Sequence, residues 1–95
     1  MSRALRLAAA AAALSVLSAQ SASLTYRVVG VARGDMLNIR ELPDAESDLI
    51  GQIPPTARAV RGFGCTDDTP SGTEWCRVKY GPVVGWVRGR FVEAN

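Results

Sequence analysis

The feature that most constrains the fold is a two-residue turn, Gly81-Pro82, inside a stretch of alternating side chains that runs from residue 75 to residue 88. Glycine takes the positive φ that the first position of a tight hairpin loop requires, and proline fixes φ at about −65° at the next. The turn therefore predicts a β-hairpin in which Tyr80 pairs with Val83 and Trp75 pairs with Arg88.

This register divides the hairpin into two faces, because successive side chains of a strand point in opposite directions. One face is apolar and is the predicted core face: Cys76, Val78, Tyr80, Val83 and Val87. The other is the predicted outer face: Trp75, Arg77, Lys79, Val84, Trp86 and Arg88. We expect both indoles to be exposed there as diagonal neighbours, with arginines beside them.

The rest of the chain after residue 23 follows the same short-strand pattern. All nine Gly and all five Pro lie there, and apolar runs of about five residues alternate with turn residues. No stretch has a helical period with caps. The pattern predicts one all-β domain over residues 24–95. Its expected strands are Tyr26–Val31, Met36–Glu41, Leu49–Ile53, Arg58–Cys65, Glu74–Tyr80, Val83–Arg88 and Phe91–Val92.

Residues 1–23 have the three parts of a secretory signal peptide, which we expect to be helical: two arginines, a nearly unbroken apolar run at Leu7–Leu17, and small residues up to Ser23. The apolar run is shorter than the roughly 20 residues of a membrane span, so no stable membrane insertion is expected after cleavage. Cleavage is expected after Ser21 or Ser23. A buried Ala-rich helix is the alternative, but it would lack caps. We therefore predict a periplasmic or secreted protein.

Composition excludes several classes of function. The chain has no His, which removes Ser-His-Asp and Cys-His nucleophiles and Cys/His zinc sites. Arg3 and Arg6 fall in the leader, so the other nine basic residues balance the nine acidic ones. That balance removes the support for nucleic acid as a partner. Asp67-Asp68 lies in a polar loop without further ligands spaced around it, so no metal or other cofactor is expected.

The two cysteines predict a disulfide in an exported domain of this size. Cys65 ends one predicted strand and Cys76 lies in the next, so their bond would close the intervening loop across neighbouring strands. Such a crosslink raises the free energy of unfolding by about 3 kcal/mol, because it restricts the unfolded chain. A redox-active role is the alternative, but the chain has no Cys-x-x-Cys motif.

A series of short motifs resembles the bacterial SH3 (SH3b, SH3-like) domain family. Members of that family run L-N-V-R-x-G-P, V-I-G-x-L, G-W-x-K-V-x-Y and G-W-V in this order. The matching segments here, from Met36 to Val92, are Leu37-Asn38-Ile39-Arg40 with Pro43, Leu49-Ile50-Gly51-Gln52-Ile53, Trp75-Cys76-Arg77-Val78, Tyr80-Gly81, Gly85-Trp86-Val87 and Phe91-Val92. The chain departs from the family at Leu42, where the family favours Gly, at Pro55-Thr56, which replaces Lys-Gly, and at Cys76, which replaces an aromatic.

The resemblance implies a partly open barrel of five to seven short antiparallel strands that binds ligands and has no enzymatic activity. SH3-like domains offer a shallow aromatic groove to extended peptides, and bacterial members often recognise cell-wall peptides. The resemblance implies that Trp75, Trp86 and Phe91 line the groove, and that residues 85–92 form a strand and a short 3₁₀ turn. The outer-face register adds Arg77 and Arg88, which suit carboxylates. Asn38 and Arg40 are expected to brace the turn after their strand.

Two functions stay open. The first is an exported module that binds cell-wall (peptidoglycan) peptide or an envelope protein through the aromatic and arginine groove. The second is a structural or regulatory accessory that pairs with an envelope partner by strand addition, for which Tyr26–Val31 is the expected exposed edge. A third reading of the outer face is packing alone, in which Arg77 stacks on Trp86 and the indoles cover a barrel edge.

Overall fold

The computed structural model describes residues 23–95, so the expected signal peptide lies outside the described residues except for Ser23. Within residues 23–95 no helix has the length and apolar character needed to cross a membrane. Seven strands and one 3₁₀ turn follow one another along the chain: β1 (Thr25–Val28), β2 (Leu37–Arg40), β3 (Leu49–Ile53), β4 (Val60–Thr66), β5 (Trp75–Tyr80), β6 (Val83–Arg88), η1 (Gly89–Phe91) and β7 (Val92–Ala94).

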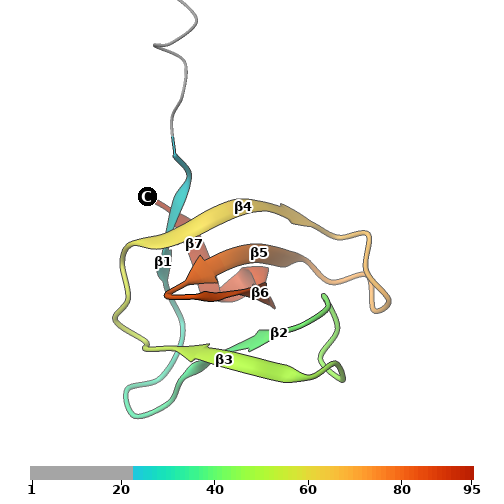
Figure 1. The fold of residues 1–95 in the computed structure, drawn as a ribbon, viewed down its shortest axis with the longest axis horizontal. Coiled ribbons are helices and arrows are strands. Elements are labelled where there is room, and N and C mark those ends of the chain that lie inside the picture. The colour runs from blue at the N-terminus through green and yellow to red at the C-terminus, as the bar shows by residue number, and fades with distance from the viewer. Residues whose placement is uncertain (1–22) are drawn as a thin grey trace, which may run out of the picture.

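The strands form one antiparallel sheet in the order β3-β2-β6-β5-β4-β1-β7. The sheet curls on itself without closing, which leaves β3 and β7 as its two edges (Figure 1). The predicted all-β, partly open barrel is therefore confirmed. The limits of β3 and β6 match those expected from the sequence, and the other strands differ by a few residues at their ends.

The β5–β6 hairpin has the register that its turn predicts. Tyr80 lies opposite Val83, and the pairing continues without interruption to Trp75 opposite Arg88. Gly81 has a φ of 58°, the left-handed conformation expected at the first loop position. The alternation of core and outer faces along both strands follows from this register.

The predicted disulfide joins Cys65 to Cys76, which also lie directly opposite each other on β4 and β5. The bond crosses the sheet next to the loop of residues 67–74. Cys65 Sγ lies 3.3 Å from the hydroxyl oxygen of Tyr26, so β1 contacts the crosslink as well. The disulfide therefore fixes three neighbouring strands at one place.

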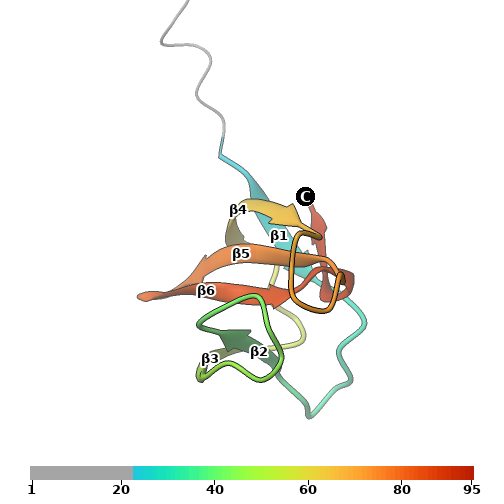
Figure 2. The same cartoon turned by 90° about the vertical axis from the view of Figure 1, so that its right-hand side faces the viewer.

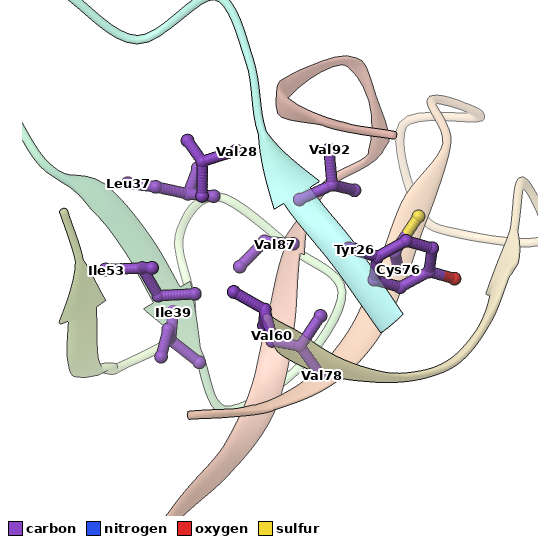
Figure 3. Packing of buried hydrophobic residues seen from close by; sticks show 10 residues of the cluster. All are labelled: Tyr26, Val28, Leu37, Ile39, Ile53, Val60, Cys76, Val78, Val87 and Val92. Atoms are coloured by element: carbon purple, nitrogen blue, oxygen red, sulfur yellow. The ribbon is translucent and has the colours of Figure 1, made fainter. Parts of the chain in front are cut away.

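The core lies on the concave side of the curled sheet. Side chains from all seven strands point toward one another there (Figure 3): Tyr26, Val28, Leu37, Ile39, Ile53, Val60, Cys76, Val78, Val87 and Val92. Tyr80 and Val83 pack against this cluster from the hairpin. The predicted core face of the hairpin is thus confirmed, and burial of these apolar side chains is the main force that holds the sheet curled.

The prediction that Tyr26–Val31 is an exposed edge is wrong. β1 ends at Val28 and lies between β4 and β7, with Tyr26 opposite Val60 on one side and opposite Ala94 on the other. The C-terminal strand supplies the second partner, and Asn95 N donates to Thr25 O at 3.0 Å. This pairing joins the two ends of the domain, and local sequence patterns carry no signal for it.

Candidate functional site

A pocket of about 480 Å³ is lined by Trp75 and Arg88 from the outer face of the hairpin, and we call it the outer-face pocket. Its walls come from five parts of the chain: the β1–β2 loop, β2, the β2–β3 loop, the β5–β6 pair and η1. The volume falls within the range of small-ligand and peptide sites. The residues that line it are Gly30, Val31, Ala32, Asp35, Met36, Leu37, Asn38, Arg40, Ala45, Trp75, Arg88, Arg90 and Phe91.

The β5–β6 pair and η1 position the aromatic wall of the pocket. Trp75 and Arg88 lie directly opposite each other at the ends of β5 and β6. The chain then turns through η1, which brings Phe91 to the same side. Val29 N donates to Phe91 O at 2.8 Å, and this hydrogen bond holds the β1–β2 loop against η1. Gly30 lies against the Phe91 ring, and its φ of 69° lets the chain turn away from β1 at that point.

The pocket is rich in positive charge. Arg40, Arg88 and Arg90 line it, whereas Asp35 is its one acidic residue. Two of the guanidinium groups lie over aromatic rings: Arg88 over Trp75 at 5.3 Å and Arg90 over Phe91 at 4.7 Å. Within residues 23–95, none of these arginines forms an ion pair. The arrangement leaves cations that are held against apolar surface and are available to an anionic ligand.

Trp75 differs most from its prediction. It was expected to be exposed on the outer face, but its side chain is 2% exposed. The register is as predicted, so the indole is on the outer face, where Arg88 lies over its ring. Residues of the β1–β2 loop and η1 line the same pocket as Trp75. Among the described residues no acceptor lies within hydrogen-bonding distance of its Nε1, although that atom is buried. A buried donor without an acceptor costs about 1–3 kcal/mol.

The five predicted groove residues divide into two groups. Trp75, Arg88 and Phe91 line the pocket. Trp86 and Arg77 do not: they face each other one row further along the outer face, where Trp86 is half-buried and Arg77 is exposed. The two indoles therefore do not form one continuous exposed platform.

Sequence reasoning missed Arg90 and Asp35 as pocket residues and assigned Arg40 only a bracing role. Arg40 Nη1 donates to Ser47 O at 3.2 Å and so braces the loop after β2, as expected. Asn38 does not brace that loop, because its Oδ1 accepts from Gln52 Nε2 at 3.1 Å on the neighbouring strand β3. Arg40 also lines the pocket. The position of Arg90 directly before Phe91 was a signal that could have been used, whereas Asp35 enters through a loop whose path no local pattern predicts.

Two loops rich in acidic residues, at 41–48 and 67–74, contain hydrogen bonds between residues close in the sequence. Asp44 Oδ1 accepts from Glu46 N at 3.0 Å inside the β2–β3 loop, and Thr66 Oγ1 accepts from Asp68 N at 3.1 Å before the β4–β5 loop. In the part of the chain that the structure covers, no three Cys, Asp or Glu side chains are grouped so that they could hold a metal ion. These loops provide turns and negative charge.

Comparison with known proteins adds no family assignment. No family model matches the chain, and no curated protein matches it either.

Proposed function

We propose that this chain is an exported SH3-like binding module without catalytic activity, which holds a carboxylate-bearing peptide in the outer-face pocket. Cell-wall (peptidoglycan) stem peptides have this chemistry, and an extended segment of an envelope protein is the other source of it. The observation that carries the proposal is the grouping of Arg40, Arg88 and Arg90 around an aromatic wall in a pocket of about 480 Å³.

The pocket offers a distinct contact for each part of such a peptide. Guanidinium groups bind carboxylates through charge-assisted hydrogen bonds. The ring of Phe91 provides apolar surface for aliphatic stems. Trp75 Nε1 lacks an acceptor among residues 23–95, and a carbonyl group of the ligand would supply one after a small movement of the wall.

Two further observations support an SH3-like domain in an oxidising compartment. Five short antiparallel strands, β2 to β6, precede a 3₁₀ turn and a final strand, which is the arrangement that the motif resemblance implies. The Cys65–Cys76 disulfide and the leader-like residues 1–23 are both typical of exported proteins. Residues 24–95 would then be the mature domain, in the periplasm or outside the cell.

Arg90 is the residue with which to test the pocket, because it is exposed and its guanidinium group forms no ion pair with any residue from 23 to 95. Titration of a soluble stem peptide into Arg90→Glu should give at least about tenfold weaker binding, since loss of a charged partner costs roughly 1.5–3 kcal/mol. Arg58→Glu makes the same change of charge at an exposed position outside the pocket and should bind as the unaltered chain does. Equal affinity of all three proteins, or no binding of stem peptide or purified wall, would contradict the proposal.

Strand addition stays the second candidate, at a different edge from the one expected. Among the strands of residues 23–95, β3 pairs only with β2, and its first two residues, Leu49 and Ile50, are exposed. An edge strand that has one side without a neighbouring strand and carries exposed apolar side chains can accept a strand from a partner. Crosslinking in the envelope distinguishes the two functions: a single protein crosslinked through β3, with no retention on purified wall, would favour strand addition.

A further inference from the structure

A second surface lies on the outer face of β4, β5 and β6 and shares no residue with the pocket. We call it the basic face and define it by the six side chains that form it: Arg61, Phe63, Arg77, Lys79, Val84 and Trp86. The register places Arg61 opposite Lys79 and Lys79 opposite Val84 in one row, and Arg77 opposite Trp86 in the next. All are exposed except Trp86, which is half-buried.

Phe63 holds two of the cations on this face. The guanidinium carbons of Arg61 and Arg77 each lie 5.6 Å from the centre of its ring. The pairing of β4 with β5 shifts between Gly62 and Gly64, and Phe63 is the additional residue at this bulge. Its ring is nevertheless 47% exposed, so it supports the cations and also presents apolar surface to the outside.

Charge is strongly segregated in this domain. Residues 24–95 carry as many basic as acidic side chains, yet β4, β5 and β6 contain no Asp or Glu. Seven of the nine acidic residues lie in two segments, 41–48 and 67–74. Both loops project from the same end of the molecule in the two views of Figures 1 and 2. A domain without net charge thus keeps one face free of negative charge.

We propose that the basic face docks peripherally on a lipid bilayer that contains anionic headgroups. Charge alone would attract any polyanion, but the face also exposes Phe63 and Val84 between its cations. An interface of phosphates above acyl chains accommodates both kinds of side chain, because cations contact the headgroups while apolar side chains enter the boundary layer. The acidic loops would orient the domain, since an anionic surface repels them.

Sedimentation with vesicles tests this proposal. The chain should bind vesicles of equal parts phosphatidylcholine and phosphatidylglycerol, and should not bind vesicles of phosphatidylcholine alone. Arg77→Glu should weaken binding at least roughly fivefold, the contribution of one cation near an anionic surface. Arg58→Glu is the matched control, because Arg58 is exposed and lies outside this face. All proteins are produced from the full sequence in the same way and therefore have the same N-terminus. Any contribution of the N-terminal residues to vesicle binding is then equal in each.

A soluble polyanion is the competing partner, and Phe63→Ser separates the two. This variant should bind the anionic vesicles several-fold more weakly while its retention on immobilised heparin changes little, because all the cations remain and only the bilayer takes up an apolar ring. The proposal is overturned if the chain binds heparin but not the vesicles, if Phe63→Ser binds the vesicles as well as the unaltered chain does, or if Arg77→Glu and Arg58→Glu behave alike. Circular dichroism of each variant verifies the fold.

Discussion

The guanidinium carbon of Arg88 lies 5.3 Å from the ring centre of Trp75, directly across the β5–β6 pair. Both residues line the pocket, and the indole is also buried, so the same contact contributes to the stability of the hairpin and to the shape of the pocket. Trp75 is therefore a packing residue as well as a candidate binding residue. Substitutions that test it must separate these two roles.

We predict that Trp75→Ala lowers the free energy of unfolding by about 3–5 kcal/mol, the cost of removing a large buried aromatic side chain. Trp75→Phe should cost less, because it keeps a ring beneath Arg88 and removes a buried N–H that lacks an acceptor. Urea unfolding measures both. If Trp75→Ala is as stable as the unaltered chain, the indole is not buried in solution.

Trp75→Phe also tests the use of Nε1 in ligand binding. If the ligand accepts a hydrogen bond from this atom, the variant should bind stem peptide roughly fivefold more weakly, the effect of one neutral hydrogen bond. Trp86→Phe is the matched control, since Trp86 does not line the pocket. Equal effects of the two substitutions would argue against a specific contact at Nε1.

Arg88→Met should destabilise the domain by about 0.5–2 kcal/mol, because it keeps the aliphatic stem over Trp75 but removes the cation. Arg88→Lys should lose less stability than Arg88→Met, since lysine keeps a positive charge near the ring. Thermal unfolding of the two variants supplies the measurement, with Arg58→Met as the control for a general change of charge. A larger loss for Lys than for Met would show that packing, and not the cation, stabilises this pair.

Reduction of the Cys65–Cys76 disulfide should lower the free energy of unfolding by about 3 kcal/mol, because the crosslink restricts the unfolded chain. Urea titrations with and without a phosphine reductant measure the change. A midpoint that does not move on reduction would mean that the bond is absent in the purified protein.

Gly62→Ala should destabilise the sheet by about 1–3 kcal/mol, the usual cost of overpacking. A Cβ at this position would clash with the ring of Tyr26, which is buried and cannot move aside freely. In a Tyr26→Ala background the same substitution should cost much less, since the two changes share one space. Additive effects in the double variant would show that the ring is not the obstacle.

Local sequence signals predicted the hairpin well because its determinants are adjacent in the chain. Gly81 supplies the conformation of the turn, and the alternation from residue 75 to residue 88 then fixes every pair up to Trp75 and Arg88. The disulfide follows from the same argument, since its cysteines lie on consecutive strands. Turn geometry and alternation could not predict most of the candidate site, because Asp35, Arg40 and Arg90 come from three segments that are separate in the sequence.

The sequence by itself determined which elements form, where the main turn lies and which side chains of each strand share a face, because propensity, turn geometry and alternation act over a few residues. Only the tertiary structure decided what covers each face. It placed β7 beside β1, which removed the expected edge, and it brought the β1–β2 loop and η1 to the pocket that Trp75 lines, where an indole expected in solvent is buried. These contacts join segments far apart in the chain, and their strength depends on mutual burial, which no local pattern records.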